Sequence, residues 1–106
     1  MVAQNDEKPE FGKIQGFIAK KYNLALVREL INNPHGLGFN ALAKGVAPIT
    51  PRMLSARLKE LEALKIIQKN LVLGAKPKIE YRATLKAESL RKAISELEKW
   101  GSKEIE

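Results

Sequence analysis

Apolar residues recur at helical spacing in three segments of the first half of the chain. An aromatic-rich repeat predicts a first helix over residues 11–21. A second repeat predicts a helix over residues 24–33, with Asn23 as its N-cap and Pro34 disfavouring its continuation. A shorter third repeat predicts a helix over residues 39–45.

The most informative pattern begins near the middle of the chain. Thr50 is a favourable N-cap and Pro51 a preferred first-turn residue, so they predict the start of a helix over about residues 50–64. In residues 67–73 and 79–83, mostly apolar side chains then alternate with mostly polar ones. This alternation predicts two strands joined by a short basic turn. A helix followed directly by such a hairpin is the layout of a winged helix-turn-helix. The expected fold is therefore mainly α with a small β-hairpin wing (α+β).

The remaining segments complete one domain, which fits a chain of 106 residues. Thr84 caps a last helix that Gly101 is expected to end. Residues 1–10 lack periodicity and are expected to form a disordered tail. The domain then covers residues 11–101, with its terminal helices available for dimerisation, and residues 102–106 form a C-terminal tail.

The positive charge of the chain is concentrated on the predicted helix and hairpin. Residues 44–82 carry nine Lys or Arg against three Asp or Glu, a net charge of +6 out of +7 for the whole chain. Residues 1–43 have a net charge of +1, and residues 83–106 of zero. A basic patch that coincides with a motif favours a polyanionic partner such as DNA, although a solvated Lys-rich surface is the alternative.

On a helical wheel, the leucines of the predicted helix lie on one side. The opposite side carries two long cations, one hydroxyl and two small side chains, namely Arg52, Ser55, Ala56, Lys59 and Ala63. Small residues let a helix enter a groove deeply, and Arg and Lys reach guanine edges or phosphates. An ordinary solvated helix face has a similar composition. The adjacent basic hairpin favours the DNA interpretation, with the helix in the major groove.

The wing, residues 73–78, adds two more expected DNA contacts, Lys76 and Lys78, on the backbone or in the minor groove. Lysines on exposed strands also serve to block edge-to-edge aggregation, which is the alternative. Lys69 and Arg82 fit either role. Tyr81 is expected to be a packing residue.

The terminal helices carry apolar residues that a small domain does not easily bury alone. In the last helix they follow a coiled-coil-like spacing. A homodimer built from both helices is expected to use Phe11, Phe17, Ile18, Leu90, Ile94, Leu97 and Trp100. The alternative is that both helices fold back on their own core.

Residues 26–84 resemble the HxlR type of winged-helix transcription regulators, and more loosely MarR-type and small archaeal Lrs-type regulators. The most specific segments are F-x-x-L at 39–42, ITPRML at 49–54, RLKELE at 57–62 and PKIEY at 77–81. The resemblance implies a homodimer that binds a pseudo-palindromic operator and regulates transcription. It also implies DNA contacts by Thr50, Arg52, Ser55, Arg57 and Lys78. Arg57 lies on the flank nearer the core, so an internal ion pair is its alternative role.

The chain departs from this family at three places. Many relatives have an N-terminal Cys, sometimes redox-active, and this chain has none. The usual Pro-Gly before the recognition helix is Ala47-Pro48 here, and a Gly common early in the last helix is absent from TLKAESL. Redox sensing by thiols is therefore excluded, whereas DNA binding is not.

The sequence gives no indication of an enzyme, a cofactor or a metal site. The serines lack a nucleophile-elbow turn, and His35 is the only histidine, in a Pro-His-Gly turn. No signal peptide or apolar run of membrane-spanning length is evident, so a cytoplasmic protein without membrane contact is expected. The function expected is a sequence-specific, double-stranded-DNA-binding transcriptional regulator. Its rivals are a winged-helix protein-interaction module and a sequence-tolerant architectural DNA-binding protein.

Overall fold

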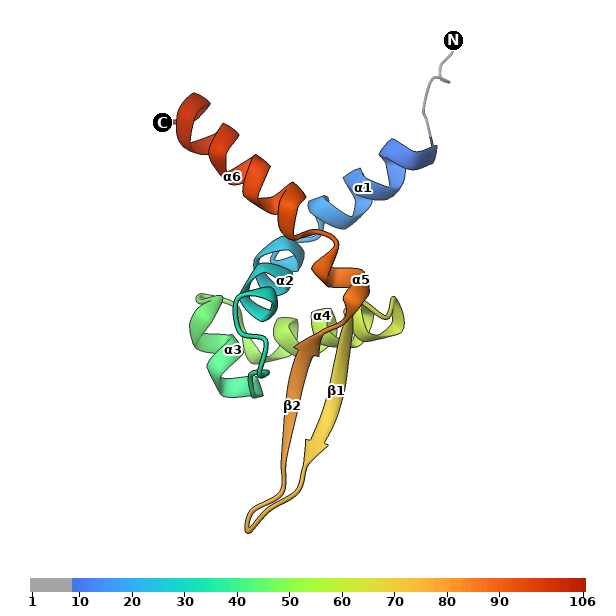
Figure 1. Ribbon diagram of the computed structural model, residues 1–106, viewed down its shortest axis with the longest axis vertical. Helices are drawn as coiled ribbons and strands as arrows, with labels where there is room; N and C mark the ends of the chain where they lie inside the picture. Colours follow the sequence, from blue (N-terminus) through green and yellow to red (C-terminus); the bar gives the residue numbers. More distant parts are fainter. Residues whose placement is uncertain (1–8) are drawn as a thin grey trace.

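The computed structural model describes residues 9–106, so most of the predicted N-terminal tail lies outside the described residues. In chain order the elements are α1 (Pro9–Ala19), α2 (Asn23–Ile31), α3 (Phe39–Gly45), α4 (Pro51–Ala63), β1 (Ile67–Val72), β2 (Lys78–Ala83), α5 (Leu85–Glu88) and α6 (Arg91–Glu104). Helices α2, α3 and α4 form the body, the hairpin β1–β2 extends from it, and α1 and α6 diverge on the opposite side (Figure 1). This arrangement confirms a mainly helical winged helix-turn-helix.

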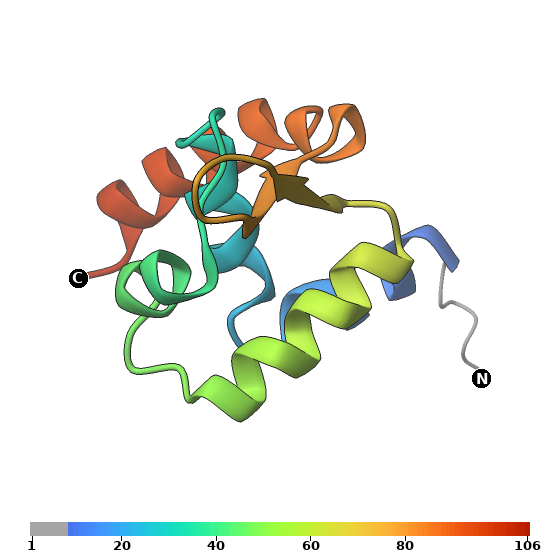
Figure 2. The same cartoon turned by 90° about the horizontal axis from the view of Figure 1, so that it is seen from below.

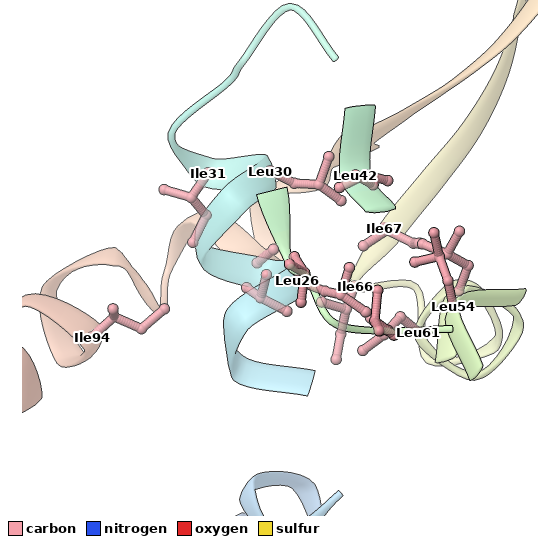
Figure 3. Close-up of a cluster of buried hydrophobic side chains, with 14 residues drawn as sticks. Leu26, Leu30, Ile31, Leu42, Leu54, Leu61, Ile66, Ile67 and Ile94 are labelled. Atoms are coloured by element: carbon pink, nitrogen blue, oxygen red, sulfur yellow. The ribbon is translucent and has the colours of Figure 1, made fainter. Parts of the chain in front are cut away.

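The core lies where α2, α3 and α4 meet the base of the hairpin (Figure 3). Its fully buried side chains are mainly leucines from the three helices, namely Leu26, Leu30, Leu42, Leu54 and Leu61, with Val27 and Ile67. Helix α4 contributes the leucine stripe that the sequence predicted, with Leu58 also buried. Because these residues recur at helical spacing, burying them fixes which side of α4 is left in solvent.

The hairpin is antiparallel, with Ile67 opposite Ala83 at its base and Leu71 opposite Ile79 near its tip. The register therefore confirms the predicted alternation of both strands. Leu37 forms a bridge to Tyr81, in which each backbone N–H donates to the other carbonyl, at 3.0 and 2.8 Å. Seen from below, the hairpin and α4 lie beside each other, with α2 behind the hairpin (Figure 2).

The N-terminal part differs from the prediction at two positions. Helix α1 begins at Pro9, inside the segment that was assigned to the tail. Asn23 is not the N-cap of α2 but its first residue, and the cap is Tyr22 in the left-handed region, at φ 76°. The Asn23 side chain instead donates from Nδ2 to the carbonyl of Phe17, at 3.2 Å. It therefore satisfies a carbonyl at the end of α1, where the helix has no internal donor.

The C-terminal part also differs, because the single predicted helix is two. Thr84 caps the short α5 as expected, since its hydroxyl accepts from the backbone N–H of Ala87 at 3.4 Å. The chain then turns at residues 89–90 before α6 begins. Gly101 does not end α6, which continues to Glu104. The predicted C-terminal tail is therefore largely helical.

Candidate nucleic-acid interface

The start of α4 is fixed by its own sequence. Thr50 is the N-cap, and its hydroxyl oxygen accepts a hydrogen bond from the backbone N–H of Met53 at 3.1 Å. Pro51 occupies the first turn, where a missing N–H has no cost. The expected helix start is therefore confirmed. The hydroxyl of Thr50 is used by the cap as an acceptor, and its proton stays available to a phosphate.

The outward side of α4 matches the predicted wheel. Arg52, Ser55, Ala56, Lys59 and Ala63 are all exposed, whereas the leucine stripe faces the core. Among the ion pairs formed within residues 9–106, none involves Arg52 or Lys59. Both cations are therefore free to bind an external anion without first breaking an internal contact.

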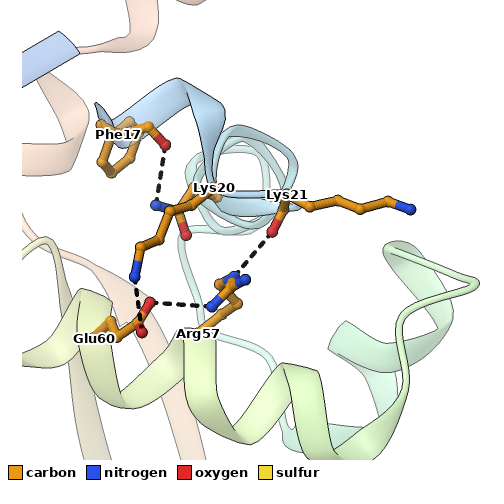
Figure 4. Close-up of polar contacts among 6 residues, drawn as sticks. Phe17, Lys20, Lys21, Arg57 and Glu60 are labelled. Atoms are coloured by element: carbon orange, nitrogen blue, oxygen red, sulfur yellow. Dashed lines mark hydrogen bonds and ion pairs between the residues drawn. The ribbon is translucent and has the colours of Figure 1, made fainter. Parts of the chain in front are cut away.

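Arg57 has a different environment from the outward cations. Its Nε donates to the backbone carbonyl of Lys21 at 3.0 Å, and its Nη1 pairs with Oε1 of Glu60 at 3.3 Å (Figure 4). Only 19% of its side chain is exposed. Arg57 therefore adopts the internal ion-pair role that the sequence left open, and we do not include it among the residues that reach DNA.

Glu60 joins α4 to the turn that follows α1. Its Oε2 accepts from Nζ of Lys20 at 3.1 Å, beside the contact of its other oxygen with Arg57 (Figure 4). The hydrogen bond from Lys20 is the main cause that lowers the pKa of Glu60, and the nearby charges of Lys20 and Arg57 act in the same direction. The sequence indicated an internal ion pair for Arg57 but not its partner Glu60 or the contacts with Lys20 and Lys21, because no local pattern predicts contacts between residues about 40 positions apart.

The cations of the wing lie in different places. Lys76 is exposed in the turn between the strands, and it takes part in none of the ion pairs found in residues 9–106. Lys78 is exposed but pairs with Oε2 of Glu80 at 3.4 Å. By the register, Lys69 shares the side of the hairpin that bears Tyr81, whereas Arg82 lies on the opposite side with Gln68.

The terminal helices expose much of the apolar surface that the sequence indicated. Phe11 and Ile18 of α1 and Leu97 and Trp100 of α6 are exposed. Phe17 and Leu90 are half-buried and pack against the core. Ile94 was expected in the dimer seam, but it is buried in the protomer core and is not available to a partner.

Two further properties limit what the site can do. Within residues 9–106, no group of three or more His, Cys, Asp or Glu side chains is placed to hold a metal ion. None of the helices in this part of the chain has the length and apolar character of a membrane span. What the surface offers is a row of cations and small residues on α4, with a second group of cations on the wing.

Comparisons with known proteins agree with this surface. The sequence model of the HxlR-like helix-turn-helix family matches residues 17–106. A relative from Halalkalibacterium halodurans, named as an uncharacterized HTH-type transcriptional regulator, is 31% identical over 100 residues, which cover 94% of this chain and 88% of the relative. YvaP of Bacillus subtilis, with the same description, is 27% identical over 103 residues, covering 97% and 94%.

Solved structures share the fold. The reduced form of the transcriptional regulator YodB from B. subtilis superposes with a TM-score of 0.82 at 23% identity, over 94% of this chain and 96% of the other. The redox regulator HypR in its oxidized form has a TM-score of 0.79 at 26% identity, over 92% and 98%. Both similarities extend over the hairpin and the terminal helices, as their coverage requires.

Proposed function

The chain belongs to the HxlR-like helix-turn-helix family of DNA-binding transcriptional regulators, and from this premise we propose that it recognises a specific duplex sequence as a homodimer. In this proposal α4, with its cap at Thr50, enters the major groove. The wing, residues 73–78, lies on the adjacent backbone or in the minor groove. The observation that carries the proposal is the outward side of α4.

That side has the composition that groove entry requires. Arg52 and Lys59 are exposed and form no ion pair within residues 9–106, so neither has to leave a partner there before it meets a base edge or a phosphate. Ser55, Ala56 and Ala63 are too short to hold the helix away from the groove floor. Arg and Lys read guanine through O6 and N7, so we assign base reading to Arg52 and Lys59.

The other contacts are assigned to the backbone. Thr50 and Ser55 carry hydroxyls at the start of α4 that suit phosphate contact, because helix N-termini attract anions. Lys76 and Lys78 in the wing add positive charge without base discrimination. Of these, Lys76 has the greater freedom, since Lys78 must first leave Glu80.

The homodimer is proposed from the exposed apolar side chains of α1 and α6. Phe11, Ile18, Leu97 and Trp100 lie on the two helices that extend away from the hairpin (Figure 1). A second copy that covers them leaves both copies of α4 exposed on the opposite side. Major-groove readers of this kind bind two half-sites about one helical turn apart.

Two rival functions share this fold. A protein-interaction module would dock an acidic protein on the basic surface, and an architectural protein would coat DNA of any sequence. The short residues between Arg52 and Lys59 favour groove entry over a flat protein partner.

DNase footprinting of the purified protein on the region upstream of its own reading frame tests the proposal. We expect protection of two symmetric half-sites at low protein concentration. Uniform coverage of the fragment would favour the architectural rival, and no protection of this or of a random-sequence fragment would favour the protein-interaction rival.

A further inference from the structure

The two sides of the hairpin differ in chemistry along its whole length. By the register, one side carries the pairs Ile67–Ala83, Lys69–Tyr81 and Leu71–Ile79. The other side carries Gln68–Arg82, Asn70–Glu80 and Val72–Lys78. The side with Ile67–Ala83 is the apolar side of the wing, and the side with Gln68–Arg82 is its polar side.

The apolar side begins in the core and ends in solvent. Ile67 is 2% exposed, and Tyr81 and Ala83 pack against the core. Further along the same side, Leu71 is 60% exposed and Ile79 is 40% exposed. Leu73, one position beyond β1, continues the alternation and is 77% exposed.

The apolar side of the wing faces α4 where the hairpin meets the core. Ile67 shares the core with Leu54 and Leu61 of α4, so the side that bears it faces α4 at the base of the hairpin (Figure 3). The hairpin then extends beyond the body, with its tip farthest from the terminal helices (Figure 1). Leu71, Ile79 and Leu73 therefore continue into solvent the side of the hairpin that packs against α4 at its base.

The exposed apolar side chains on this side of the wing indicate a surface that another molecule covers. Grouped apolar residues on the surface of a small domain mark an interaction site, and exposed strands with them are prone to aggregate. The core does not use Leu71 or Leu73, and a polar residue at either position would preserve the strand.

We propose that the wing meets duplex DNA through its apolar side, with Leu71, Ile79 and Leu73 against the sugar edges of the minor groove. This inference rests on the proposed function, since it names the surface by which the wing binds the same duplex. Proteins that enter the minor groove often use Leu or Ile side chains there. In this proposal one duplex contacts both the outward side of α4 and the apolar side of the wing.

The charges of the hairpin support DNA as the occupant. Lys69 lies on the apolar side, and Lys76 lies in the turn at its end. Glu80 is the only acidic residue between Lys65 and Ala87, and it lies on the polar side in an ion pair with Lys78. No carboxylate therefore opposes a phosphate on the apolar side. On this account Lys69 is a phosphate contact, whereas Arg82 faces away from the duplex.

Salt dependence separates an apolar contact from an ionic one. Only neutralised phosphates release counterions, so losing an apolar contact weakens binding without changing the slope of log K against log[salt]. The test compares Leu71→Ser and Leu73→Ser with Leu85→Ser and Lys76→Ala, by fluorescence anisotropy with the footprinted duplex at several salt concentrations. Leu85 is a matched control because it is 88% exposed and begins α5.

We expect Leu71→Ser and Leu73→Ser each to weaken binding about tenfold, the size that burial of a leucine side chain supports, with an unchanged slope. Leu85→Ser should bind as the wild type, and Lys76→Ala should reduce the magnitude of the slope by about 2, because the dimer loses one phosphate contact in each copy. Circular dichroism of each variant checks the fold, and Leu73, outside both strands, gives a readout independent of strand pairing.

Two results would overturn the inference while the proposed function stands. One is wild-type affinity of both leucine variants for the duplex. The other is that these variants sediment as a different oligomer from the wild type, while the DNA affinity of the dimer is unaltered. That result would assign the apolar side to a contact with a second copy of the chain. If the wild type binds no duplex, the proposed function itself fails.

Discussion

Arg57 of α4 donates a hydrogen bond from Nε to the backbone carbonyl of Lys21, in the turn that follows α1, at 3.0 Å. Glu60, one helical turn further along α4, accepts from Lys20 in the same turn at 3.1 Å. These contacts join α4, the proposed recognition helix, to the end of a helix that we assign to the dimer. The orientation of α4 therefore depends on the N-terminal part of the chain.

Arg57→Ala should destabilise the protein by about 1–2 kcal/mol, because it removes a charged hydrogen-bond donor from the carbonyl of Lys21 at a side chain that is only 19% exposed. Arg52→Ala, the matched change on the exposed side, should alter the free energy of unfolding by less than about 0.5 kcal/mol. Urea denaturation measures both. Unchanged stability of Arg57→Ala together with weaker DNA binding would instead make Arg57 a direct DNA contact.

Glu60 predicts a pH dependence of stability. Its pKa lies below the ordinary value of 4.5, chiefly because Lys20 donates a hydrogen bond to it. A carboxylate with a lower pKa in the folded state than in the unfolded chain stabilises the fold above its unfolded-state pKa, and this contribution disappears as the pH falls through the folded-state value. Wild type and Glu60→Gln should therefore differ in free energy of unfolding at pH 7 and converge at acidic pH.

Denaturation of both proteins between pH 7 and pH 3 checks this prediction. Because 40% of the Glu60 side chain is exposed to solvent, the difference should be small and should shrink in high salt. Glu96→Gln, which removes a surface carboxylate from an ion pair within α6, is the control. A difference that persists unchanged at the lowest pH would show that the glutamine acts through something other than lost charge.

Mutations that remove base contacts and mutations that remove backbone contacts should differ in their effects on DNA affinity. Arg52→Ala and Lys59→Ala should cost roughly 1–3 kcal/mol on the specific duplex and much less on a random one, because they remove base contacts. Lys76→Ala should weaken both duplexes alike and flatten the salt slope. Anisotropy on the two duplexes measures this. Equal losses on both duplexes for all three variants would refute the assignment of base reading to α4.

Assembly should respond to exposed residues of α6 and not to its buried one. Leu97→Glu or Trp100→Glu should convert a dimer to a folded monomer that binds DNA weakly, because a charge replaces an exposed apolar contact. Ile94→Ala should instead lower the free energy of unfolding by about 2–5 kcal/mol, as expected for a cavity in the core. Lys92→Glu, on the side of α6 away from Ile94, is the control.

Analytical ultracentrifugation at tens of micromolar, with circular dichroism on each variant, measures both effects. A wild type that is monomeric at this concentration would contradict the proposed homodimer. Variants of Leu97 and Trp100 that stay dimeric would move the interface to another surface.

The fold followed from the sequence where local rules determine it. The cap at Thr50, the leucine stripe of α4 and the alternation of the hairpin were all confirmed, because each depends on residues close together in the chain. Gly101 shows where such rules fail. A glycine often ends a helix, yet α6 continues past it, and only three-dimensional structure showed this.

The candidate site was predictable to the same extent. Periodicity correctly placed Arg52 and Lys59 on the outward side, because a helix has a fixed period. It wrongly placed Ile94 in a dimer seam, whereas Ile94 is buried in the protomer core. The spacing of an apolar residue does not show whether its own chain or a second copy covers it. The contacts of Arg57 with Lys21 and Glu60 with Lys20 depend on how two helices pack, which no local pattern specifies.

Sequence-specific recognition of duplex DNA is the central claim, and competition anisotropy tests it most directly. The wild-type protein is bound to the labelled footprinted duplex at about 0.15 M salt and displaced either by the same duplex or by one with both half-sites scrambled. We expect the specific duplex to compete at least about a thousandfold better, the lower range for regulators of specific sites. Equal competition by the two duplexes, or no binding at all, would contradict the account.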